Sequence, residues 1–406
     1  MLKKHLIKLT IIILIIGGIS MLVSLGREKV NATLYFGDNN MSSKERLTHI
    51  LNVGCKESDF DIDSSQFSQN LANISISLSA SAADPSIAFD NLKEMSFENS
   101  VKFSYDKDYK GDVVGLIISS KRMSDCTLIA IIIRGTVGRE WYSNFDTGYS
   151  STHKGFEHSS EFVYEKLKLY ITKYSLENEK LKFLVTGHSR GGAVANLLSK
   201  QLIDLYGSQN VYAYTFASPN TTTIHEDDKY QNIFNIVNSQ DIIAYLPLES
   251  WGYTKYGTTI EISPTDDEES ENNVQSVFKD ITGNDYTQFD DDTAVDNCLE
   301  ELYNLSNNVD EYYTKKYPVG GTELTTYEYF KIVADLLSGD NTVNIGVLKN
   351  TMDSDFSGVS QFFSSGIDML NFVFTRQIKS SSIIDAHCVD GYVALINAYS
   401  TENAVK

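Results

Sequence analysis

The chain has 406 residues, of which 42% are apolar and 22% are charged, so it is long enough to bury one large hydrophobic core or two smaller ones. This composition excludes a disordered or fibrous protein. With 34 basic and 54 acidic residues, the formal net charge is -20. Such a surface would repel nucleic-acid phosphates and anionic membranes, so we expect no nucleic-acid partner and no polybasic anchor.

The first 32 residues have the pattern of a secretory leader. Three lysines, Lys3, Lys4 and Lys8, precede an apolar run at 9–25, and small residues at 30–32 offer cleavage after Ala32. We therefore predict a secreted protein with a signal peptide. The alternative is a membrane anchor formed by residues 9–25, because that run is close to the roughly 20 residues that span a bilayer.

From residue 60 to 262, helical and strand patterns alternate, which is typical of a mainly parallel sheet covered by helices. The helices are expected at 67–83, 86–95, 157–174 and 189–206. The strands are expected at 112–119, 127–134, 182–186, 211–216, 233–237 and 258–262. The run at 128–133 holds six consecutive apolar residues, as in a strand buried on both faces.

The pattern changes after residue 264. Residues 266–301 contain 13 acidic residues and one lysine, a net charge of -12, and we interpret them as a solvated acidic stretch. Helical spacing follows at 298–313, 324–337 and 359–374. We therefore predict a first domain part at 33–263, a mostly helical insertion or cap at 264–380, and a final domain part at 381–406. The four cysteines form no C-x-x-C pair, and no metal or cofactor is implied.

A G-x-S-x-G motif lies between the strand expected at 182–186 and a long amphipathic helix, the context that a nucleophile elbow requires. The motif residues are Gly187, His188, Ser189, Arg190 and Gly191. Glycines there allow strand and helix to approach closely around a strained turn. The pattern predicts Ser189 as a nucleophile; the alternative is a turn serine without chemistry.

A serine nucleophile needs a histidine base and a carboxylate that holds this base, and in this fold they follow the serine in the order acid, then histidine. His387 is the only histidine after residue 241, so it is the predicted base if Ser189 is the nucleophile. Asp241 is favoured as the carboxylate because it follows the strand at 233–237, at the edge where parallel sheets place ligands. The alternative carboxylates are Asp204, on the helix that follows Ser189, and Asp227 and Asp228, in the loop before the strand at 233–237.

Acyl transfer also needs two donors for the oxyanion. One is expected to be the N–H of Arg190, which follows the nucleophile. The second is expected from Thr136, just after the buried run at 128–133. The alternative for Thr136 is an ordinary turn at the end of a strand.

Five ordered pieces of the sequence resemble the class 3 lipase family of fungal-type and bacterial triacylglycerol lipases. These pieces are Ile-Arg-Gly-Thr at 133–136, His-Lys-Gly-Phe at 153–156, Gly-His-Ser-Arg-Gly-Gly at 187–192, Thr-Phe-Ala-Ser-Pro at 215–219, and 238–241 with Leu-Pro at 246–247. The resemblance implies an α/β-hydrolase fold, Ser189, Asp241 and His387 as a catalytic triad, and Thr136 with Arg190 as oxyanion donors. It agrees with the roles argued from the residues.

One segment is longer than its counterpart in that family, and a second has two alternative interpretations. The family usually connects its acid and histidine by a much shorter segment than the 146 positions from Asp241 to His387. Residues 137–150, which include Trp141, Tyr142 and Phe145, stand where the family has a mobile lid, and a short helix packed on the sheet is the alternative.

We therefore predict a serine hydrolase that cleaves lipid esters such as acylglycerols and works at a lipid–water interface. The alternatives are a carboxylesterase or phospholipase for polar substrates, and a non-catalytic surface binding protein on a hydrolase fold. The sequence predicts no oligomeric state.

Overall fold

The computed structural model describes residues 54–105, 114–135, 150–226, 228–264, 268–289, 293–307, 316–319, 322–325 and 380–399. The predicted leader, Thr136, nearly all of the lid candidate and the helix expected at 359–374 lie outside these ranges.

The core of the fold is a seven-stranded sheet whose strands follow the chain order. β1, β2 and β3 pair antiparallel, whereas β3 through β7 pair parallel. The strands are β1 (Glu98–Phe103), β2 (Leu116–Arg122), β3 (Thr127–Ile133), β4 (Leu181–His188), β5 (Val211–Phe216), β6 (Ile233–Asn238) and β7 (Thr258–Ile262).

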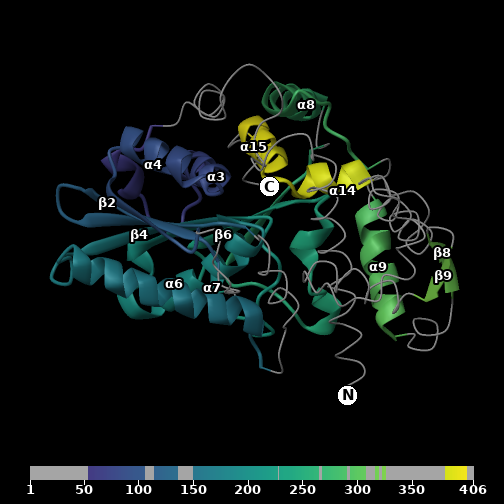
Figure 1. The fold of residues 1–406 in the computed structure, drawn as a ribbon, viewed down its shortest axis with the longest axis horizontal. Coiled ribbons are helices and arrows are strands. Elements are labelled where there is room, and N and C mark those ends of the chain that lie inside the picture. The colour runs from purple at the N-terminus through teal and green to yellow at the C-terminus, as the bar shows by residue number, and fades with distance from the viewer. Residues whose placement is uncertain are drawn as a thin grey trace.

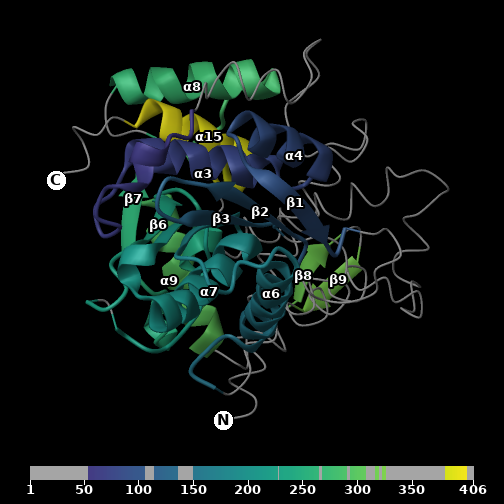
Figure 2. The same cartoon turned by 90° about the vertical axis from the view of Figure 1, so that its left-hand side faces the viewer.

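Helices cover both faces of this sheet. α3, α4 and α15 lie on one face and α6 and α7 on the other, each set with its own apolar core (Figures 1 and 2). Their bounds are α3 (Gln69–Ser81), α4 (Pro85–Glu94), α6 (Lys154–Lys173), α7 (Arg190–Tyr206) and α15 (Val389–Ala398). Short 3-10 helices are η1 (Glu57–Phe60), η2 (Ser208–Asn210), η3 (Ile242–Tyr245) and η4 (Glu249–Trp251). The predicted α/β-hydrolase fold is confirmed.

The central strands are buried on both faces, as their sequences predict. All seven residues of β3 and all six of both β5 and β6 are buried. The parallel register aligns Ile133 with Gly187 and His188 with Phe216, so the carboxyl ends of β3, β4 and β5 meet at one edge. Ligand sites of open parallel sheets form at this edge.

Several predicted boundaries differ from the observed ones. The strands expected at 211–216 and 258–262 coincide with β5 and β7, whereas β2 begins at Leu116 rather than at residue 112. β1 was not predicted. The hairpin of β8 (Lys316–Val319) and β9 (Thr322–Thr325) was also not predicted, and the helix expected from residue 324 is wrong for 324–325, which end β9.

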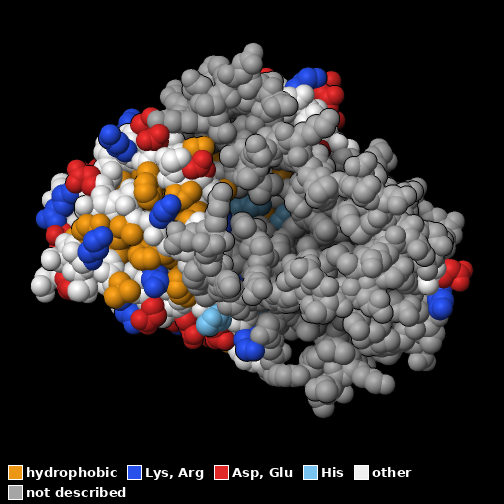
Figure 3. Space-filling view, in the orientation of Figure 1, with side chains coloured by type: hydrophobic (Ala, Val, Ile, Leu, Met, Phe, Trp, Pro, Cys, Tyr) orange, Lys and Arg blue, Asp and Glu red, His pale blue; other side chains and the backbone are white. Residues whose placement is uncertain are grey.

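The acidic stretch contains two helices, α8 (Glu268–Thr282) and α9 (Ala294–Asn307). α8 packs along α15, on the side away from the sheet (Figure 2). It buries Val274, Phe278 and Ile281 while its first-turn acids stay in solvent, so it is an amphipathic helix rather than a fully solvated stretch. On the face shown in Figure 3, acidic and basic side chains are interspersed over the described residues.

Candidate active site

Ser189 lies on a tight turn between β4 and α7. Its backbone has φ 57° and ψ -125°, a conformation that a non-glycine residue adopts only under strain. Glycines make the turn possible: a Cβ at Gly191 would lie 2.2 Å from the Ile133 carbonyl oxygen, and one at Gly187 would lie 2.3 Å from that of Gly191. The turn therefore presents the half-buried Ser189 at the carboxyl edge of the sheet.

The three side chains predicted to form a triad lie in one chain of hydrogen bonds. The Ser189 hydroxyl is 2.9 Å from Nε2 of His387, and Nδ1 of His387 is 2.9 Å from Oδ2 of Asp241. Asp241 follows β6, and His387 is the last residue of α14 (Ser380–His387). Asp241 is 1% exposed, so its carboxylate is held away from water. This arrangement lets the carboxylate fix the imidazole tautomer with Nε2 directed at the serine.

Tyr392, which sequence reasoning missed, supports Asp241 from α15. Its hydroxyl donates to Oδ2 of Asp241 over 2.8 Å and accepts the backbone N–H of Asn238 over 3.0 Å. Burial, and next the charge of Asp241, raise the pKa of Tyr392 well above its ordinary value, so the hydroxyl keeps its proton. The N–H of Ile243 also donates to Asp241, over 3.0 Å. These donors orient the carboxylate.

Tyr392→Phe is expected to lower both stability and activity. It leaves the Asn238 N–H buried without its acceptor, which costs about 1–3 kcal/mol of unfolding free energy. It also removes the hydrogen bond to Oδ2 of Asp241, so the carboxylate is held less firmly and kcat should fall by about tenfold. Urea unfolding and ester turnover on the same preparation check the two effects; an unchanged kcat would show that Asp241 needs no hydroxyl partner.

Two further residues that the sequence did not single out for this role hold the backbone of α14. His188 Nε2 lies 2.8 Å from the carbonyl oxygen of His387, and Asn238 Nδ2 donates to that of Ala386 over 3.0 Å. Burial, and next the electrostatic effect of the neighbouring His387, lower the pKa of His188 to about 3. His188 is therefore neutral near pH 7 and donates its Nε2–H to this carbonyl.

Of the predicted oxyanion donors, Arg190 begins α7, next to Ser189, where the N–H groups of the first turn lack helical acceptors. Its side chain is 1% exposed; the guanidinium donates to Oγ of Ser159 over 2.6 Å and lies 5.7 Å from the centre of the Phe156 ring. The His153 ring stacks on Phe156. This packing gives the His-Lys-Gly-Phe segment a structural purpose, because it supports the residue after Ser189. Thr136 lies outside the described residues.

Lys255 is a buried cation close to the Asp241 loop. Its ammonium donates to the carbonyl oxygens of Ser218, over 2.6 Å, and Ala244, over 2.8 Å. Burial lowers its pKa from an ordinary 10.5 to about 7, while the charge of Asp241 opposes this change. Between pH 7 and pH 10.5 the unfolded chain binds a proton at Lys255 that the folded chain does not, so the free energy of unfolding rises with pH. At pH 7 and below, the cost of burying the charged ammonium lowers stability by its full amount.

We expect wild-type stability, measured against Lys255→Met by urea unfolding, to rise by about 1 kcal/mol per pH unit from pH 7.5 to pH 9.5. The exposed Lys173, changed to methionine, serves as the control and should show no such trend. A difference between wild type and Lys255→Met that stays constant with pH would contradict the lowered pKa.

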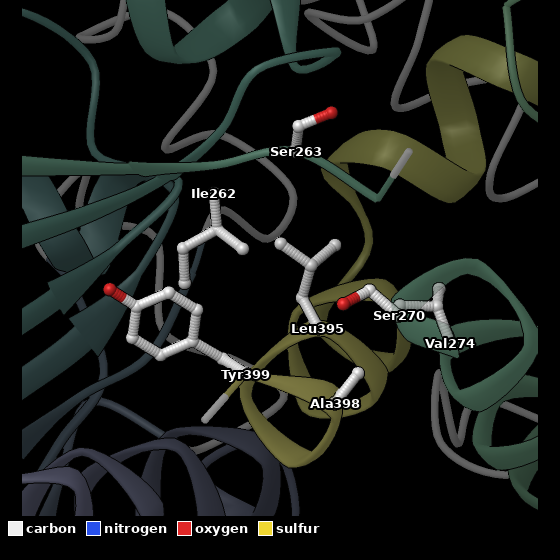
Figure 4. Close-up of a pocket in the computed structure, with 7 residues that line it drawn as sticks. All are labelled: Ile262, Ser263, Ser270, Val274, Leu395, Ala398 and Tyr399. Atoms are coloured by element: carbon white, nitrogen blue, oxygen red, sulfur yellow. The ribbon is translucent and has the colours of Figure 1, made fainter. Parts of the chain in front are cut away.

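A small cavity of about 10 Å³, room for about one water molecule, lies between β7, α8 and α15 (Figure 4). Its lining is mainly apolar: Ile262, Ser263, Ser270, Val274, Leu395, Ala398 and Tyr399. Within the described ranges, no group of His, Cys, Asp and Glu side chains could hold a metal ion, and no helix is long and apolar enough to cross a membrane. The four cysteines, all described, form no disulfide.

The fold and the contacts of Ser189 define an α/β-hydrolase with a hydrogen-bonded serine, histidine and aspartate. Residues 130–251 match the family model "Lipase (class 3)", so this segment of the chain is similar to that family.

Among curated proteins, a secreted mono- and diacylglycerol lipase of Fusarium solani is 31% identical over 142 residues, 31% of this chain and 41% of that protein. A Caenorhabditis elegans lipase is 25% identical over 223 residues, 50% of this chain and 62% of the relative. The chain thus spans about half the length of these relatives. Among solved structures, a Rhizomucor miehei lipase–propeptide complex is 23% identical, with a TM-score of 0.37, over 48% of this chain and 70% of its own.

Proposed function

We propose that the protein is an exported serine hydrolase that cleaves carboxylic esters of lipids, in particular acylglycerols, through an acyl-enzyme on Ser189. The observation that carries this proposal is the hydrogen-bond chain from Ser189 through His387 to the buried Asp241, built on a strained turn. The class 3 lipase match and the mono- and diacylglycerol lipase relative support the substrate class.

In the proposed mechanism, Ser189 Oγ attacks the ester carbonyl carbon while His387 Nε2 accepts the serine proton. The developing oxyanion is stabilised by the N–H of Arg190 and by Thr136. His387 then gives its proton to the leaving alcohol, and the acyl group stays on Ser189. Water, deprotonated by His387, attacks the acyl carbon; the bond to Ser189 Oγ breaks, His387 returns this proton to Ser189 Oγ, and the fatty acid leaves. Asp241 stabilises the imidazolium throughout.

Substrate profiling tests the substrate class. We expect hydrolysis of nitrophenyl esters to extend to long acyl chains and turnover to rise when the substrate forms an emulsion. A strict preference for short, soluble chains without interfacial gain would favour a carboxylesterase. Preference for a phosphorylated head group would favour a phospholipase, and absence of any turnover with intact, folded protein would favour a binding protein.

Export is proposed from the leader pattern of residues 1–32 and agrees with the secreted Fusarium relative. Residues 264–380 are proposed as an insertion between the two parts of the hydrolase domain. Expression of the full chain in a secreting host, followed by N-terminal sequencing, should find Thr33 as the first residue. A retained N-terminus in the membrane fraction would favour the anchor.

A further inference from the structure

A short segment after α8, residues 283–289, lies between the Asp241 loop and α14; we call it the strap. Three hydrogen bonds tie its backbone to these elements. Thr287 N–H donates to Asp385 Oδ2 over 2.9 Å, and Ser382 Oγ donates to the carbonyl of Gln288 over 2.7 Å. Phe289 N–H donates to Oε1 of Gln240 over 3.3 Å. The strap thus contacts both elements that supply the partners of Ser189.

Tyr286 joins the strap to Asn238, at the end of β6. The Asn238 amide nitrogen donates to the Tyr286 hydroxyl over 2.9 Å and to the Ala386 carbonyl over 3.0 Å, and its oxygen accepts the N–H of Gln240. Asn238 is fully buried, so each of these groups would be costly to leave unpaired. Tyr286 is therefore the acceptor that completes the bonding of Asn238, which in turn holds the residue before His387.

The strap is itself fixed by α8. The Gln275 side chain donates to the Tyr286 carbonyl over 2.8 Å and accepts its N–H over 3.0 Å. The Tyr286 ring packs edge-on against Phe278, with 5.1 Å between ring centres, in a cluster that includes Ala394 of α15. Tyr286 is 3% exposed. The position of its hydroxyl is therefore set by both backbone and side-chain contacts.

We propose that the strap is a positioning element for the site and that Tyr286 is a positioning residue: through Asn238 it sets the place of His387 relative to Ser189 and Asp241. This inference rests on the proposed function for its kinetic consequence. It also gives residues 268–289 of the acidic stretch, part of the long connection between Asp241 and His387, a role in positioning the reacting side chains.

Tyr286→Phe removes only the hydroxyl, and Tyr170→Phe is its matched control. Tyr170 is 1% exposed, and its hydroxyl donates to Oγ of Ser120 over 2.9 Å, between α6 and β2, so its loss costs stability without touching the strap. On a short, soluble nitrophenyl ester we expect kcat to fall by about tenfold for Tyr286→Phe with little change in KM, and to stay at the wild-type level for Tyr170→Phe. Gln275→Ala changes a partly exposed side chain and should also lower kcat. It replaces Tyr286→Phe as the test variant if Tyr286→Phe does not fold.

A second readout does not depend on turnover: the downfield proton NMR signal of His387 Nδ1–H, bonded to Asp241. It should shift in Tyr286→Phe and in Gln275→Ala, and remain in place in Tyr170→Phe. A shifted signal in a chain without esterase activity would support the positioning role while contradicting the proposed function. If kcat and the signal of both strap variants match those of Tyr170→Phe, the positioning role is wrong.

Discussion

Ser189→Ala is expected to lower kcat/KM for a carboxylic ester by on the order of 10⁵-fold or more, because no other group can carry the acyl intermediate. Ser189 is half-buried on the turn, and alanine removes only its oxygen. The variant should therefore keep the wild-type unfolding midpoint and still bind substrate. Progress curves at high enzyme concentration, with circular dichroism as the folding control, measure the loss.

His387→Ala should cost about as much as Ser189→Ala, and the double variant about as much as either alone. This non-additivity is expected because nucleophile and base, 2.9 Å apart, act as one unit. Losses that multiply in the double variant would mean that the two residues act independently, which would contradict their roles in one triad.

Gly191→Ala should abolish activity for a steric reason. The added Cβ would lie 2.2 Å from the carbonyl oxygen of Ile133 and 2.9 Å from that of Arg134, and both are backbone atoms that cannot move without shifting the end of β3. The Arg190 N–H and Ser189 would move with the turn. Because a displacement of about 1 Å can cost about 100-fold, we expect kcat to fall by at least that factor, together with a lower thermal midpoint.

Gly54→Ala provides the matched control, because a Cβ there meets no atom within 4 Å. This variant should retain both turnover and thermal midpoint. Wild-type turnover in Gly191→Ala would mean that the turn and the end of β3 can separate at little cost, and would contradict the close packing of the site.

The strands that support the site were predictable because their sequences are continuous apolar runs. β3 and β5, fully buried, differ from prediction by at most one residue at either end. β1 escaped prediction because it is an edge strand with half-exposed residues and polar side chains at Glu98, Asn99 and Ser100, which carry no periodic apolar signal. The β8–β9 hairpin was missed because apolar spacing after Leu324 was interpreted as helical.

Within the site, Ser189, His387 and Asp241 could be predicted because each has a feature that is visible in the sequence itself. Ser189 has its motif, His387 is the last histidine, and Asp241 follows a recognisable strand. Their supports have no such signal: Tyr392 meets Asp241 across 151 positions, and Asn238 meets Ala386 across 148. His188 was noted only as part of the motif. Such contacts depend on how α14 and α15 return to the sheet, which local patterns do not predict.

The most direct test of the Ser189–His387–Asp241 mechanism is fluorophosphonate labelling of the purified full chain, followed by peptide mass spectrometry. The mechanism predicts one phosphonylated residue, Ser189, and no labelling at all in Ser189→Ala. Folded wild-type protein that stays unlabelled under conditions that label a known esterase, or that carries the label on another residue, would contradict it.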